Sequence, residues 1–420
     1  MSVFEVGPGG PLRGRLSVPG DKSISHRVLL LAALADGTCT IRGLSDGLDV
    51  RCTLSIIRQV GADVDEGSDG TLRIRGGRLH GPDDVLDVGN SGTGIRLLAG
   101  MLAGLPFRSV LDGDASIRRR PMDRVLAPLA QMGARVSGSD GSTLAPLAID
   151  GGGLTGIEYE SPVASAQVKG CVLFAGLSAD GPTTVVEALL TRAHTEELFA
   201  ATGIDVVEEP GRITVSPGRP VPFDHEVEGD PSQAAFWAVA ASIVPGSEVV
   251  VQDVYRGPAR GGFVDVLRRM GADLDHDPDG GDLTVRAAAL HGTVVGADEV
   301  PGLVDEIPVL AVAAACAEGE TRFEGVAELR VKESDRIATV EGLLEAMGGS
   351  VRTEGDVLVV EGGRLRGASV RSHHDHRIAM AGAVAALVAD GPTTVDGWDA
   401  VATSYPGFAD DLAALRGGGD

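Results

Sequence analysis

Side chains that could bind anions gather in a few short polar stretches of the chain. The stretch 21–27 reads D-K-S-I-S-H-R and places an ammonium, a hydroxyl and a guanidinium at the start of a predicted helix. Ser23 and Arg27 share a face of that helix because they are four residues apart. Helix N-termini favour phosphates and carboxylates, so Lys22, Ser23 and Arg27 predict an anion clamp. The alternative is an N-cap beside a surface pair, and a Walker loop is excluded because G-x-x-x-x-G-K is absent.

Two further stretches predict contacts to an anion. In G-N-S-G-T-G-I-R at 89–96, Gly92 has no Cβ and lets the backbone approach a ligand, although a glycine-rich turn explains the stretch equally well. Arg118, Arg119 and Arg120 are consecutive in a chain of net charge -24. Such a run is usually a solvated face, but its position in a loop after a predicted strand favours anion binding as much.

A third stretch repeats this chemistry at another predicted helix start. S-A-Q-V-K at 165–169 offers the hydroxyl of Ser165, the amide of Gln167 and the ammonium of Lys169. After the next predicted strand, Thr195 is expected to cap a helix, which leaves Arg192 as a candidate anion contact.

Candidate acids and bases lie in the C-terminal half. Asp305 and Glu306 precede an apolar helix, so one is expected to cap the helix and the other to face a ligand as a base. The stretch 331–336, V-K-E-S-D-R, is either a salt-bridged turn or part of the same site. In H-H-D-H-R at 373–377 we favour an acid–base imidazole, His376, beside an anion-holding Arg377. A metal site is disfavoured because adjacent residues rarely converge on one ion.

Composition limits the partners. The net charge of -24 makes nucleic acid a poor ligand but does not exclude small anions held in a local pocket. No apolar run reaches the roughly 18 residues of a membrane span, and the N-terminus lacks a signal peptide, so we expect a cytoplasmic protein. The four cysteines form no C-x-x-C pair and read as reduced. Among 36 basic residues only Lys22, Lys169 and Lys332 are lysines, which suggests that an ammonium able to shift its pKa was needed there.

The elements that must position these residues follow a repeat. A polar start, a buried apolar helix, a strand, an amphipathic helix ending in Gly and another strand recur six times at intervals of about 70 residues. The predicted buried helices include 28–35, 234–244, 307–317 and 378–389, and the polar starts carry the residue types that cap helices. Several positive helix ends would then point to one surface, unless the repeats form a solenoid without a common focus.

Three such repeats make a globule of ordinary size, so we predict an α/β protein of two similar globular domains. The first domain is expected to span 21–228, and the second 1–20 together with 229–420.

Eight stretches in this order resemble the 5-enolpyruvylshikimate-3-phosphate (EPSP) synthases over the whole chain. They are K-S-x-S-H-R at 22–27, G-N-S-G-T at 89–93, R-P-M at 120–122, S-A-Q-V-K at 165–169, R-A-H-T-E at 192–196, D-E-I-P-V-L at 305–310, R-V-K-E-S-D-R at 330–336 and D-H-R-I-A-M at 375–380. The resemblance implies two domains of three βαβαββ repeats each, an inside-out α/β barrel with the active site in the interdomain cleft. It also implies transfer of the enolpyruvyl group of phosphoenolpyruvate to the 5-hydroxyl of shikimate 3-phosphate, with release of phosphate.

The resemblance assigns residues to both substrates. The implied shikimate 3-phosphate contacts are Lys22, Ser23, Arg27, Ser165, Ala166, Gln167, Arg192, Asp305 and Lys332. The implied phosphoenolpyruvate contacts are Lys22, Gly92, Arg120, Gln167, Arg336 and Arg377. The implied acid–base residues are Lys22, Asp305, Glu333 and His376, and which of them donates and which accepts stays open. The resemblance implies no metal, no cofactor and a monomer.

Two rival functions are weighed against this one. The sister enolpyruvyl transferase that acts on a UDP-amino sugar typically carries Lys-Asn at the first helix and a cysteine in the loop matching 112–121, whereas this chain has Lys22-Ser23 and no cysteine there. A non-catalytic anion-binding repeat protein would not need acid–base candidates beside the clamps. The resemblance also implies glyphosate as an inhibitor. At Thr403, Glu328 and Gly170 the chain departs from the usual family pattern in a way that resembles the glyphosate-tolerant branch. Gly92, however, keeps the glycine that some tolerant members replace.

Overall fold

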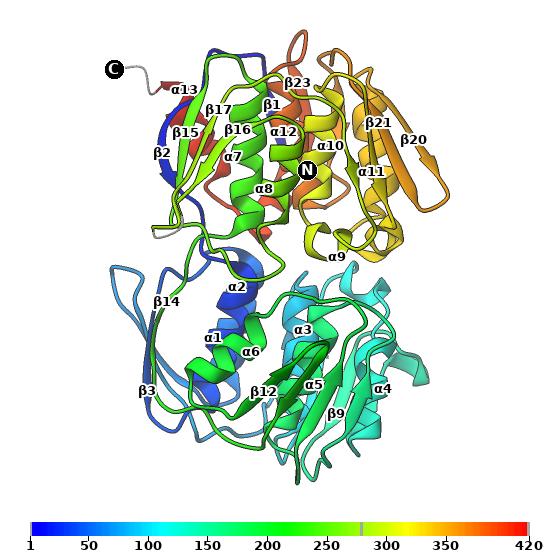
Figure 1. Cartoon of the computed structure of the whole chain (residues 1–420). Helices are drawn as coiled ribbons and strands as arrows, with labels where there is room; N and C mark the ends of the chain where they lie inside the picture. The colour runs from blue at the N-terminus through cyan, green and yellow to red at the C-terminus, as the bar shows by residue number, and fades with distance from the viewer. Residues whose placement is uncertain (1, 278–279, 418–420) are drawn as a thin grey trace. The chain divides into compact units, whose positions relative to one another are not determined.

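The computed structural model describes residues 2–277 and 280–417 of the chain. The chain forms two compact units. Unit 1 consists of Met1–Pro19 and Glu228–Asp420, and unit 2 consists of Gly20–Val227. In Figure 1 each unit is built from small sheets and helices that alternate along the chain.

Unit 2 contains three four-stranded sheets with the strand orders β14-β3-β5-β4, β6-β7-β9-β8 and β10-β11-β13-β12. Its strands are β3 (Thr38–Arg42), β4 (Asp63–Glu66), β5 (Leu72–Arg75), β6 (Leu86–Asp87), β7 (Arg108–Asp112), β8 (Arg135–Ser137), β9 (Leu147–Asp150), β10 (Glu158–Glu160), β11 (Thr183–Val186), β12 (Val206–Glu209), β13 (Arg212–Val215) and β14 (Asp224–Glu226). Its helices are α1 (Lys22–Leu34), α2 (Leu48–Gln59), α3 (Gly92–Ala103), α4 (Asp123–Gln131), α5 (Ala166–Gly176) and α6 (His194–Ala201), with short 3₁₀ turns η1 (Ile117–Arg119) and η2 (Ser139–Gly141).

Unit 1 contains the sheets β2-β15-β17-β16 and β18-β19-β21-β20 and a three-stranded sheet β1-β23-β22. Its strands are β1 (Val3–Val6), β2 (Arg13–Ser17), β15 (Glu248–Gln252), β16 (Asp273–His276), β17 (Leu283–Arg286), β18 (Val294–Val295), β19 (Glu320–Glu324), β20 (Ser350–Glu354), β21 (Val357–Glu361), β22 (Ser369–Arg371) and β23 (Thr393–Asp396). Its helices are α7 (Pro231–Ile243), α8 (Gly262–Arg269), α9 (Val300–Leu303), α10 (Ile307–Ala315), α11 (Arg336–Ala346), α12 (His376–Ala386) and α13 (Phe408–Gly417), with 3₁₀ turns η3 (Val326–Val331) and η4 (Trp398–Thr403).

Every sheet follows one connection rule. A first strand pairs in parallel with a second, and the second pairs antiparallel with a further strand, as in β6-β7-β9. A buried helix joins the parallel pair, as α3 joins β6 to β7, because parallel strands need a crossover. The first repeat of each unit takes its first strand from elsewhere in the chain: β14 pairs with β3, and β2 pairs with β15 in the register Arg15↔Val250. The predicted α/β fold of βαβαββ repeats is confirmed.

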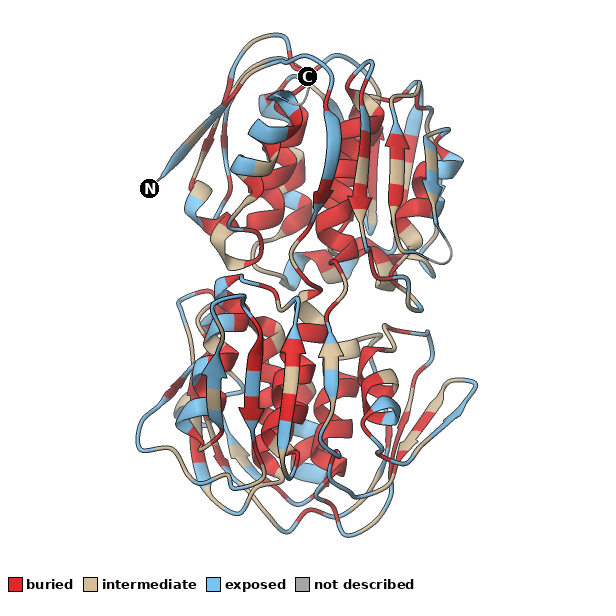
Figure 2. Cartoon of the chain, turned by 90° about the vertical axis from the view of Figure 1, so that its left-hand side faces the viewer, coloured by how far each residue is buried: buried red, intermediate tan, exposed pale blue. Residues whose placement is uncertain are grey.

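The core of each unit is made by the helices that are apolar all round. In unit 2 these are α1, α3 and α5, and in unit 1 they are α7, α10 and α12. In Figure 2 the inner helices of each unit are coloured mostly as buried. Strands alternate instead: in β5 Leu72 and Ile74 are buried, whereas Arg73 and Arg75 are exposed. One face of each sheet therefore packs on the helices and the other carries ion pairs such as Arg212–Glu158.

Three of the four buried helices with predicted ranges begin earlier than the sequence predicts, whereas α10 begins at Ile307 as predicted. α1 begins at Lys22 and not at residue 28, α7 at Pro231 and not at 234, and α12 at His376 and not at 378. The reason is that the polar residues before each apolar run form the first helical turn, and Asp21, Asp230 and Asp375 cap it. The charged motifs thus lie within the first turns of these helices.

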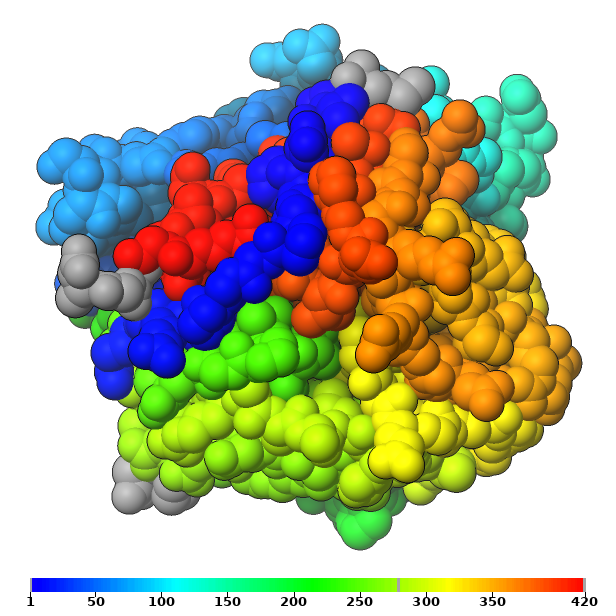
Figure 3. All heavy atoms as spheres, turned by 90° about the horizontal axis from the view of Figure 1, so that it is seen from above, coloured from blue at the N-terminus to red at the C-terminus, as the bar shows by residue number. Residues whose placement is uncertain are grey.

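The N-terminal segment completes two sheets of unit 1. β1 pairs antiparallel with β23, almost 400 residues later along the chain, with Val3 opposite Asp396. In Figure 3 this blue segment crosses unit 1 between the red C-terminal helix and the orange-red strand region. The Phe4 ring also stacks on Trp398, with centroids 4.1 Å apart. Among the described residues, no helix has the length and hydropathy required to cross a membrane.

Candidate active site

The start of α1 carries Lys22, Ser23 and Arg27, the residues that the sequence predicts as anion contacts. The Asp21 side chain accepts the Ile24 N–H at 2.9 Å and fixes the helix start. Arg27 is buried, and its Nε donates to Thr195 Oγ1 at 2.7 Å while Nη1 donates to the Ser23 carbonyl at 2.8 Å. Its Nη2 reaches the Ala166 carbonyl at 3.4 Å, so one guanidinium ties α1 to the starts of α5 and α6.

Thr195 does not cap α6, contrary to the prediction. The helix begins at His194 with Ala193 as its N-cap and has no side-chain cap. Because Thr195 lies inside the first turn and its hydroxyl accepts from Arg27, the hydroxyl serves a contact between helices. Arg192 lies in the turn that precedes α6 and is partly exposed.

His26 joins the clamp to the next repeat, a role that sequence reasoning missed. Its Nδ1 lies 2.8 Å from Thr53 Oγ1 on α2, and its Nε2 lies 3.1 Å from Ser91 Oγ, the N-cap of α3. Burial, with the nearby charges of Lys22 and Arg27, holds the pKa of His26 well below its ordinary value. A neutral imidazole therefore links the first turns of two buried helices.

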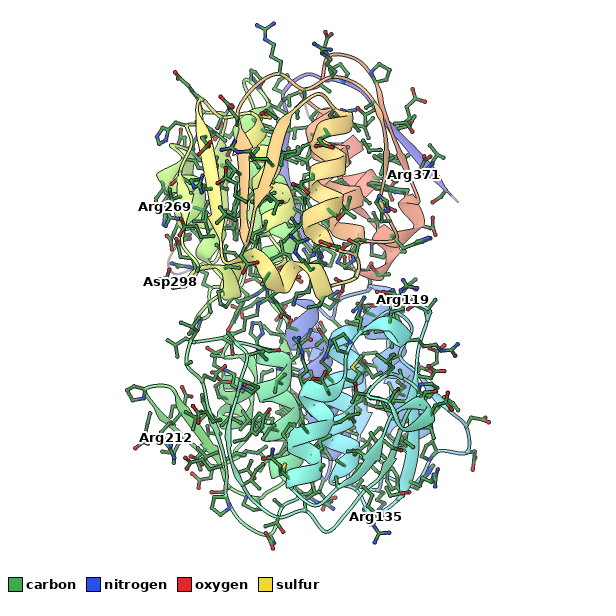
Figure 4. The ribbon with its side chains drawn as sticks, turned by 90° about the vertical axis from the view of Figure 1, so that its right-hand side faces the viewer. Arg119, Arg135, Arg212, Arg269, Asp298 and Arg371 are labelled. Carbon is green, nitrogen blue, oxygen red and sulfur yellow. The ribbon has the colours of Figure 1, made fainter. Side chains whose placement is uncertain are left out.

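The start of α3 brings Gly92 against Arg120. Ser91 Oγ accepts the Gly94 N–H at 2.9 Å. A Cβ at Gly92 would lie 2.5 Å from Arg120 Nη1, so a side chain here would require the Arg120 guanidinium to shift. Arg120 is buried and its Nη2 donates to Asn90 Oδ1 at 2.9 Å, whereas Arg119 is exposed and projects from unit 2 (Figure 4). The three consecutive arginines thus have different environments, since Arg118 forms an ion pair with Asp112.

Gln167 is held in one orientation by α3. Its Oε1 accepts from Arg96 Nη1 at 2.8 Å, and its Nε2 donates to Thr93 Oγ1 at 3.0 Å. Ser165 caps α5 through the Val168 N–H at 3.4 Å. Sequence reasoning gave Arg96 no role, and its position four residues after Gly92 is the only signal for one.

The lysines of unit 2 have different partners. Lys22 Nζ lies 3.0 Å from Asp49 Oδ2 in a largely buried pair at the start of α1. Lys169 lies in the core, where its ammonium contacts Glu187 at 2.9 Å and Glu196 at 2.6 Å. Lys169 therefore has a structural role, because its ammonium is enclosed by two carboxylates.

Arg336 is the centre of the charged cluster in unit 1. Its Nη1 contacts Asp305 at 2.9 Å, its Nη2 contacts Glu333 at 2.7 Å, and its Nε contacts Asp375 at 2.9 Å. Burial opposes the charge of the guanidinium, but the three carboxylates outweigh burial and raise the pKa of Arg336. The side chains of Asp305 and Glu333 remain partly exposed, whereas that of Asp375 is buried.

Lys332 lies beside this cluster. Its Nζ is 3.1 Å from Glu328 Oε1, and a quarter of its side chain is exposed. Burial lowers the pKa of Lys332, although the carboxylates of Glu328 and Asp305 oppose that shift.

Neither acid before α10 caps that helix, so this part of the prediction is wrong. Glu306 has helical backbone angles because α9 leads directly into α10, and a capping residue needs an extended backbone. Pro308 also has no N–H to offer a cap. Instead, Glu306 is buried and accepts hydrogen bonds from Ser232 and from Arg260, the latter at 3.3 Å, while Asp305 contacts Arg336.

The first turn of α12 places two predicted residues next to Arg336. Asp375 caps the helix through the Arg377 N–H at 2.9 Å and also accepts from Arg336. His376 and Arg377 follow it, and both are buried. The Arg377 guanidinium carbon lies 5.9 Å from the centre of the Phe236 ring. Nε and Nη1 of Arg377 have no hydrogen-bond partner in the described part of the chain.

Comparison with known proteins identifies the family. The sequence model of the EPSP synthases, 3-phosphoshikimate 1-carboxyvinyltransferases, matches residues 6–412. The 3-phosphoshikimate 1-carboxyvinyltransferase of Synechococcus sp. is 50% identical over 98% of this chain and 96% of its own, and that of Herpetosiphon aurantiacus is 48% identical over 96% and 97%. The chain belongs to the EPSP synthase family. The predicted resemblance and the predicted enzyme class are confirmed.

Solved structures agree with this identification. An EPSP synthase of Acinetobacter baumannii superimposes with a TM-score of 0.86, at 40% identity over 98% of both chains. The enolpyruvyl transferase NikO of Streptomyces tendae, at 20% identity and a TM-score of 0.79, shares the fold. EPSP synthases are transferases of the shikimate pathway and of aromatic amino acid biosynthesis, and they move the enolpyruvyl group of phosphoenolpyruvate to shikimate 3-phosphate, as predicted for this chain. A non-catalytic repeat protein is therefore excluded.

Within each unit of this EPSP synthase, the structure brings the predicted residues together. Unit 2 holds Lys22, Ser23, Arg27, Gly92, Arg120, Ser165, Ala166, Gln167 and Arg192 at the starts of α1, α3, α5 and α6 or in the loops beside them. Unit 1 holds Asp305, Lys332, Glu333, Arg336, His376 and Arg377 at the starts of α10, α11 and α12. Asp49, which pairs with Lys22, and Arg260, which pairs with Glu306, were not predicted and lie outside the motifs.

Proposed function

We propose that these two sets of residues bind the two anionic substrates of the EPSP synthase reaction. Shikimate 3-phosphate is assigned to Lys22, Ser23, Arg27, Ser165, Ala166, Gln167, Arg192, Asp305 and Lys332. Phosphoenolpyruvate is assigned to Lys22, Gly92, Arg120, Gln167, Arg336 and Arg377. The two compact units are, on this proposal, the two domains of the enzyme.

One observation carries this proposal: Arg377 is a buried cation without a carboxylate partner among the residues that the structure describes. Only 2% of the residue is exposed, and Nε and Nη1 find no acceptor among the described residues. A guanidinium out of water is costly unless an anion pairs with it. The Phe236 ring offsets only a part of that cost. A carboxylate of the substrate would supply the missing charge and both acceptors.

Helix N-termini add to the binding of anions in unit 2. Arg120, Gly92 and the amide of Gln167 lie around the first turn of α3, whose N-terminus carries partial positive charge. The missing side chain of Gly92 lets the Arg120 guanidinium approach the backbone at this helix start. These features support the phosphoenolpyruvate contacts despite the acidic composition of the chain.

The chemistry we propose is addition followed by elimination. Asp305 accepts the proton of the 5-hydroxyl as the hydroxyl oxygen forms a bond to C2 of phosphoenolpyruvate. Arg336, 2.9 Å from Asp305, stabilises the carboxylate before that transfer. The methylene carbon takes a proton at the same time, which gives a tetrahedral intermediate. Loss of phosphate from C2 and removal of a proton from the new methyl group then restore the enolpyruvyl double bond.

The donor to the methylene carbon is Lys22 or Glu333, and His376 is a further acid–base candidate. Glu333 shares Arg336 with Asp305, so these two carboxylates are electrostatically coupled. The cations of the chain supply the stabilisation of charge in this mechanism, so it requires no metal or organic cofactor.

Release of phosphate tests the proposal. The purified chain is incubated with phosphoenolpyruvate and shikimate 3-phosphate, and inorganic phosphate is followed with time. The same assay with a UDP-amino sugar as acceptor should give no phosphate above background. Asp305→Asn should abolish turnover while circular dichroism and Tm stay unchanged. Turnover by Asp305→Asn, or equal activity with the sugar acceptor, would contradict the assignment.

We also propose that the enzyme is a cytoplasmic monomer. One polypeptide carries both sets of residues, and the four cysteines are free, as expected in a reducing compartment. The net charge of -24 is unfavourable for nucleic acid. Glyphosate is an expected ligand of the phosphoenolpyruvate contacts.

A further inference from the structure

A second buried polar group, without a partner in the described part of the chain, lies in the first turn of α7. Gln233 is 1% exposed, and neither Nε2 nor Oε1 has a hydrogen-bond partner among the described residues. A buried primary amide normally fills most of its four hydrogen-bonding positions, and leaving them empty destabilises a protein. None of the sequence motifs assigned a role to Gln233.

Helical spacing places Gln233 on the face of α7 that meets Arg377. Phe236 follows Gln233 by three residues and Trp237 by four, so all three share a face. The Phe236 ring lies 5.9 Å from the Arg377 guanidinium carbon. Trp237 Nε1 donates to Tyr405 OH at 3.0 Å, which brings the segment after η4 to the same face. Ser404, next to Tyr405, is also 1% exposed and its hydroxyl has no partner within the described ranges.

On the neighbouring side of α7 the polar side chains contact one another, and two carboxylates share one guanidinium. Ser232 and Gln233 point about 100° apart around the helix axis. Ser232 donates to Glu306, and Arg260 contacts Asp230 at 2.5 Å and Glu306 at 3.3 Å. Outside this network, the amide of Gln233, the guanidinium of Arg377 and the hydroxyl of Ser404 have buried atoms without a partner among the described residues, and all three groups can donate to an anion.

We propose that Gln233 is a further binding residue for the anionic group that Arg377 takes from phosphoenolpyruvate. This inference rests on the proposed assignment of Arg377. Gln233 Nε2 donates to an oxygen of the substrate anion that the Arg377 guanidinium binds. Ser404 provides a third donor at the same place. The site combines the positive ends of α7 and α12 with three buried polar side chains.

Two substitutions of Gln233 test this inference. Gln233→Leu removes the polar atoms at nearly constant size, and it should raise the KM for phosphoenolpyruvate about tenfold. The KM for shikimate 3-phosphate and kcat should stay within about twofold, and Tm should not fall, because an unpaired buried amide is replaced by an apolar group. Gln233→Glu should raise the KM for phosphoenolpyruvate further, because its carboxylate would pair with Arg377. Gln252→Leu, at the end of β15 in the same unit, is the matched control and should behave as the unsubstituted chain.

A binding measurement separates this inference from the proposed function. Both tryptophans lie in unit 1, and Trp237 stacks on Phe408 with centroids 4.6 Å apart, so pyruvate binding can be followed by quenching of their fluorescence. Gln233→Leu should weaken the binding of pyruvate about tenfold. This result is expected even if the unsubstituted enzyme releases no phosphate. An active enzyme whose KM for phosphoenolpyruvate is unchanged within twofold in both variants would overturn the role of Gln233 and leave the proposed function intact. Equal increases in both KM values, or a fall in Tm of Gln233→Leu, would show a structural role instead. If Gln233→Leu does not fold, the KM values of Gln233→Glu decide in the same way.

Discussion

Basic side chains of an acidic chain serve different purposes according to what surrounds them. Arg336 is enclosed by three carboxylates, Arg377 lies on an aromatic ring, and Arg119 is exposed to solvent. The lysines differ as well: Lys169 is a buried structural cation, whereas Lys332 has a lowered pKa beside the cluster of Arg336. Residue type alone does not separate a binding cation from a structural one, so substitutions at matched pairs are the informative ones.

Arg120 and Arg119 form such a pair. Arg120→Ala should raise the KM for phosphoenolpyruvate by roughly 10- to 100-fold, because a buried charged hydrogen bond contributes about 1.5–3 kcal/mol. Binding of shikimate 3-phosphate, measured by titration calorimetry, should change less than about threefold. Arg119→Ala removes an exposed guanidinium one residue away and should leave both values as they are. An equal loss for the two substrates in Arg120→Ala would remove the residue from the phosphoenolpyruvate contacts.

Lys169 and Lys332 form a second pair. Lys169→Met should lower the free energy of unfolding by about 3–5 kcal/mol, because Glu187 and Glu196 would lose their buried counter-charge. Urea unfolding at pH 7 measures this loss, which should shrink at lower pH as the carboxylates take up protons. Lys332→Met should lower the free energy of unfolding by less than about 1 kcal/mol, because the pair with Glu328 is partly exposed. It should, however, weaken the binding of shikimate 3-phosphate. Comparable stability losses in the two variants would contradict the structural role of Lys169.

At the scale of elements, the first turns of the buried helices do two things at once. A capping side chain fixes where each helix starts, as Asp21, Ser91 and Asp375 do. A second side chain then links that start to the next helix: His26 joins α1 to α3, and Arg336 joins α10, α11 and α12. The proposed binding residues at these helix starts are therefore held by rigid elements.

His26 gives these links a dependence on pH. Its folded-state pKa is held well below the ordinary 6.5, so between the two values the unfolded chain binds the proton and the folded chain does not. The stability from this group is present above about pH 6.5 and is lost as pH falls below it, at up to about 1.4 kcal/mol per pH unit. His26→Asn should reduce the slope of unfolding free energy between pH 7 and 5, although His225 and His276, whose pKa burial also lowers, retain part of it.

Urea unfolding at several pH values measures that slope. The exposed His80 provides the control, and His80→Asn should give the slope of the unsubstituted chain. If His26→Asn and the unsubstituted chain lost stability equally between pH 7 and 5, a neutral buried imidazole at His26 would be disproved.

At the scale of the whole molecule, the two units differ in how the chain builds them. Unit 2 is one continuous segment, Gly20–Val227, which contains all the strands of its three sheets. Unit 1 needs the N-terminal segment as well, because β1 completes the sheet of β23 and β2 completes the sheet of β15. Removing that segment exposes strand edges whose hydrogen bonds would be unpaired.

The fragments should therefore behave differently. A fragment of residues 20–227 should fold alone with a cooperative urea transition, since it has a core of its own. A fragment of residues 228–420 should fail to fold cooperatively, and addition of a peptide of residues 2–19 should restore a transition. Circular dichroism during urea titration measures both. Cooperative unfolding of 228–420 without the peptide would show that the two N-terminal strands are dispensable.

Much of this protein could be predicted from local sequence. The repeat, the buried helices and the caps at Ser91 and Ser165 follow from apolar periodicity and from side chains that bond backbone groups two or three residues away. These are short-range effects, and a linear sequence records them directly. The order of eight motifs also predicted the family.

Only the tertiary structure decided which charges meet. Nothing local in the sequence indicates that Arg336 contacts Asp305 and Asp375, about 30 and 40 residues away along the chain. The buried pair of Lys169 with Glu196, the link of His26 to Ser91 and the contact of Glu306 with Arg260 likewise join separate elements. The physical reason is that the energy of a charge depends on distance and on burial, and both are properties of the folded chain.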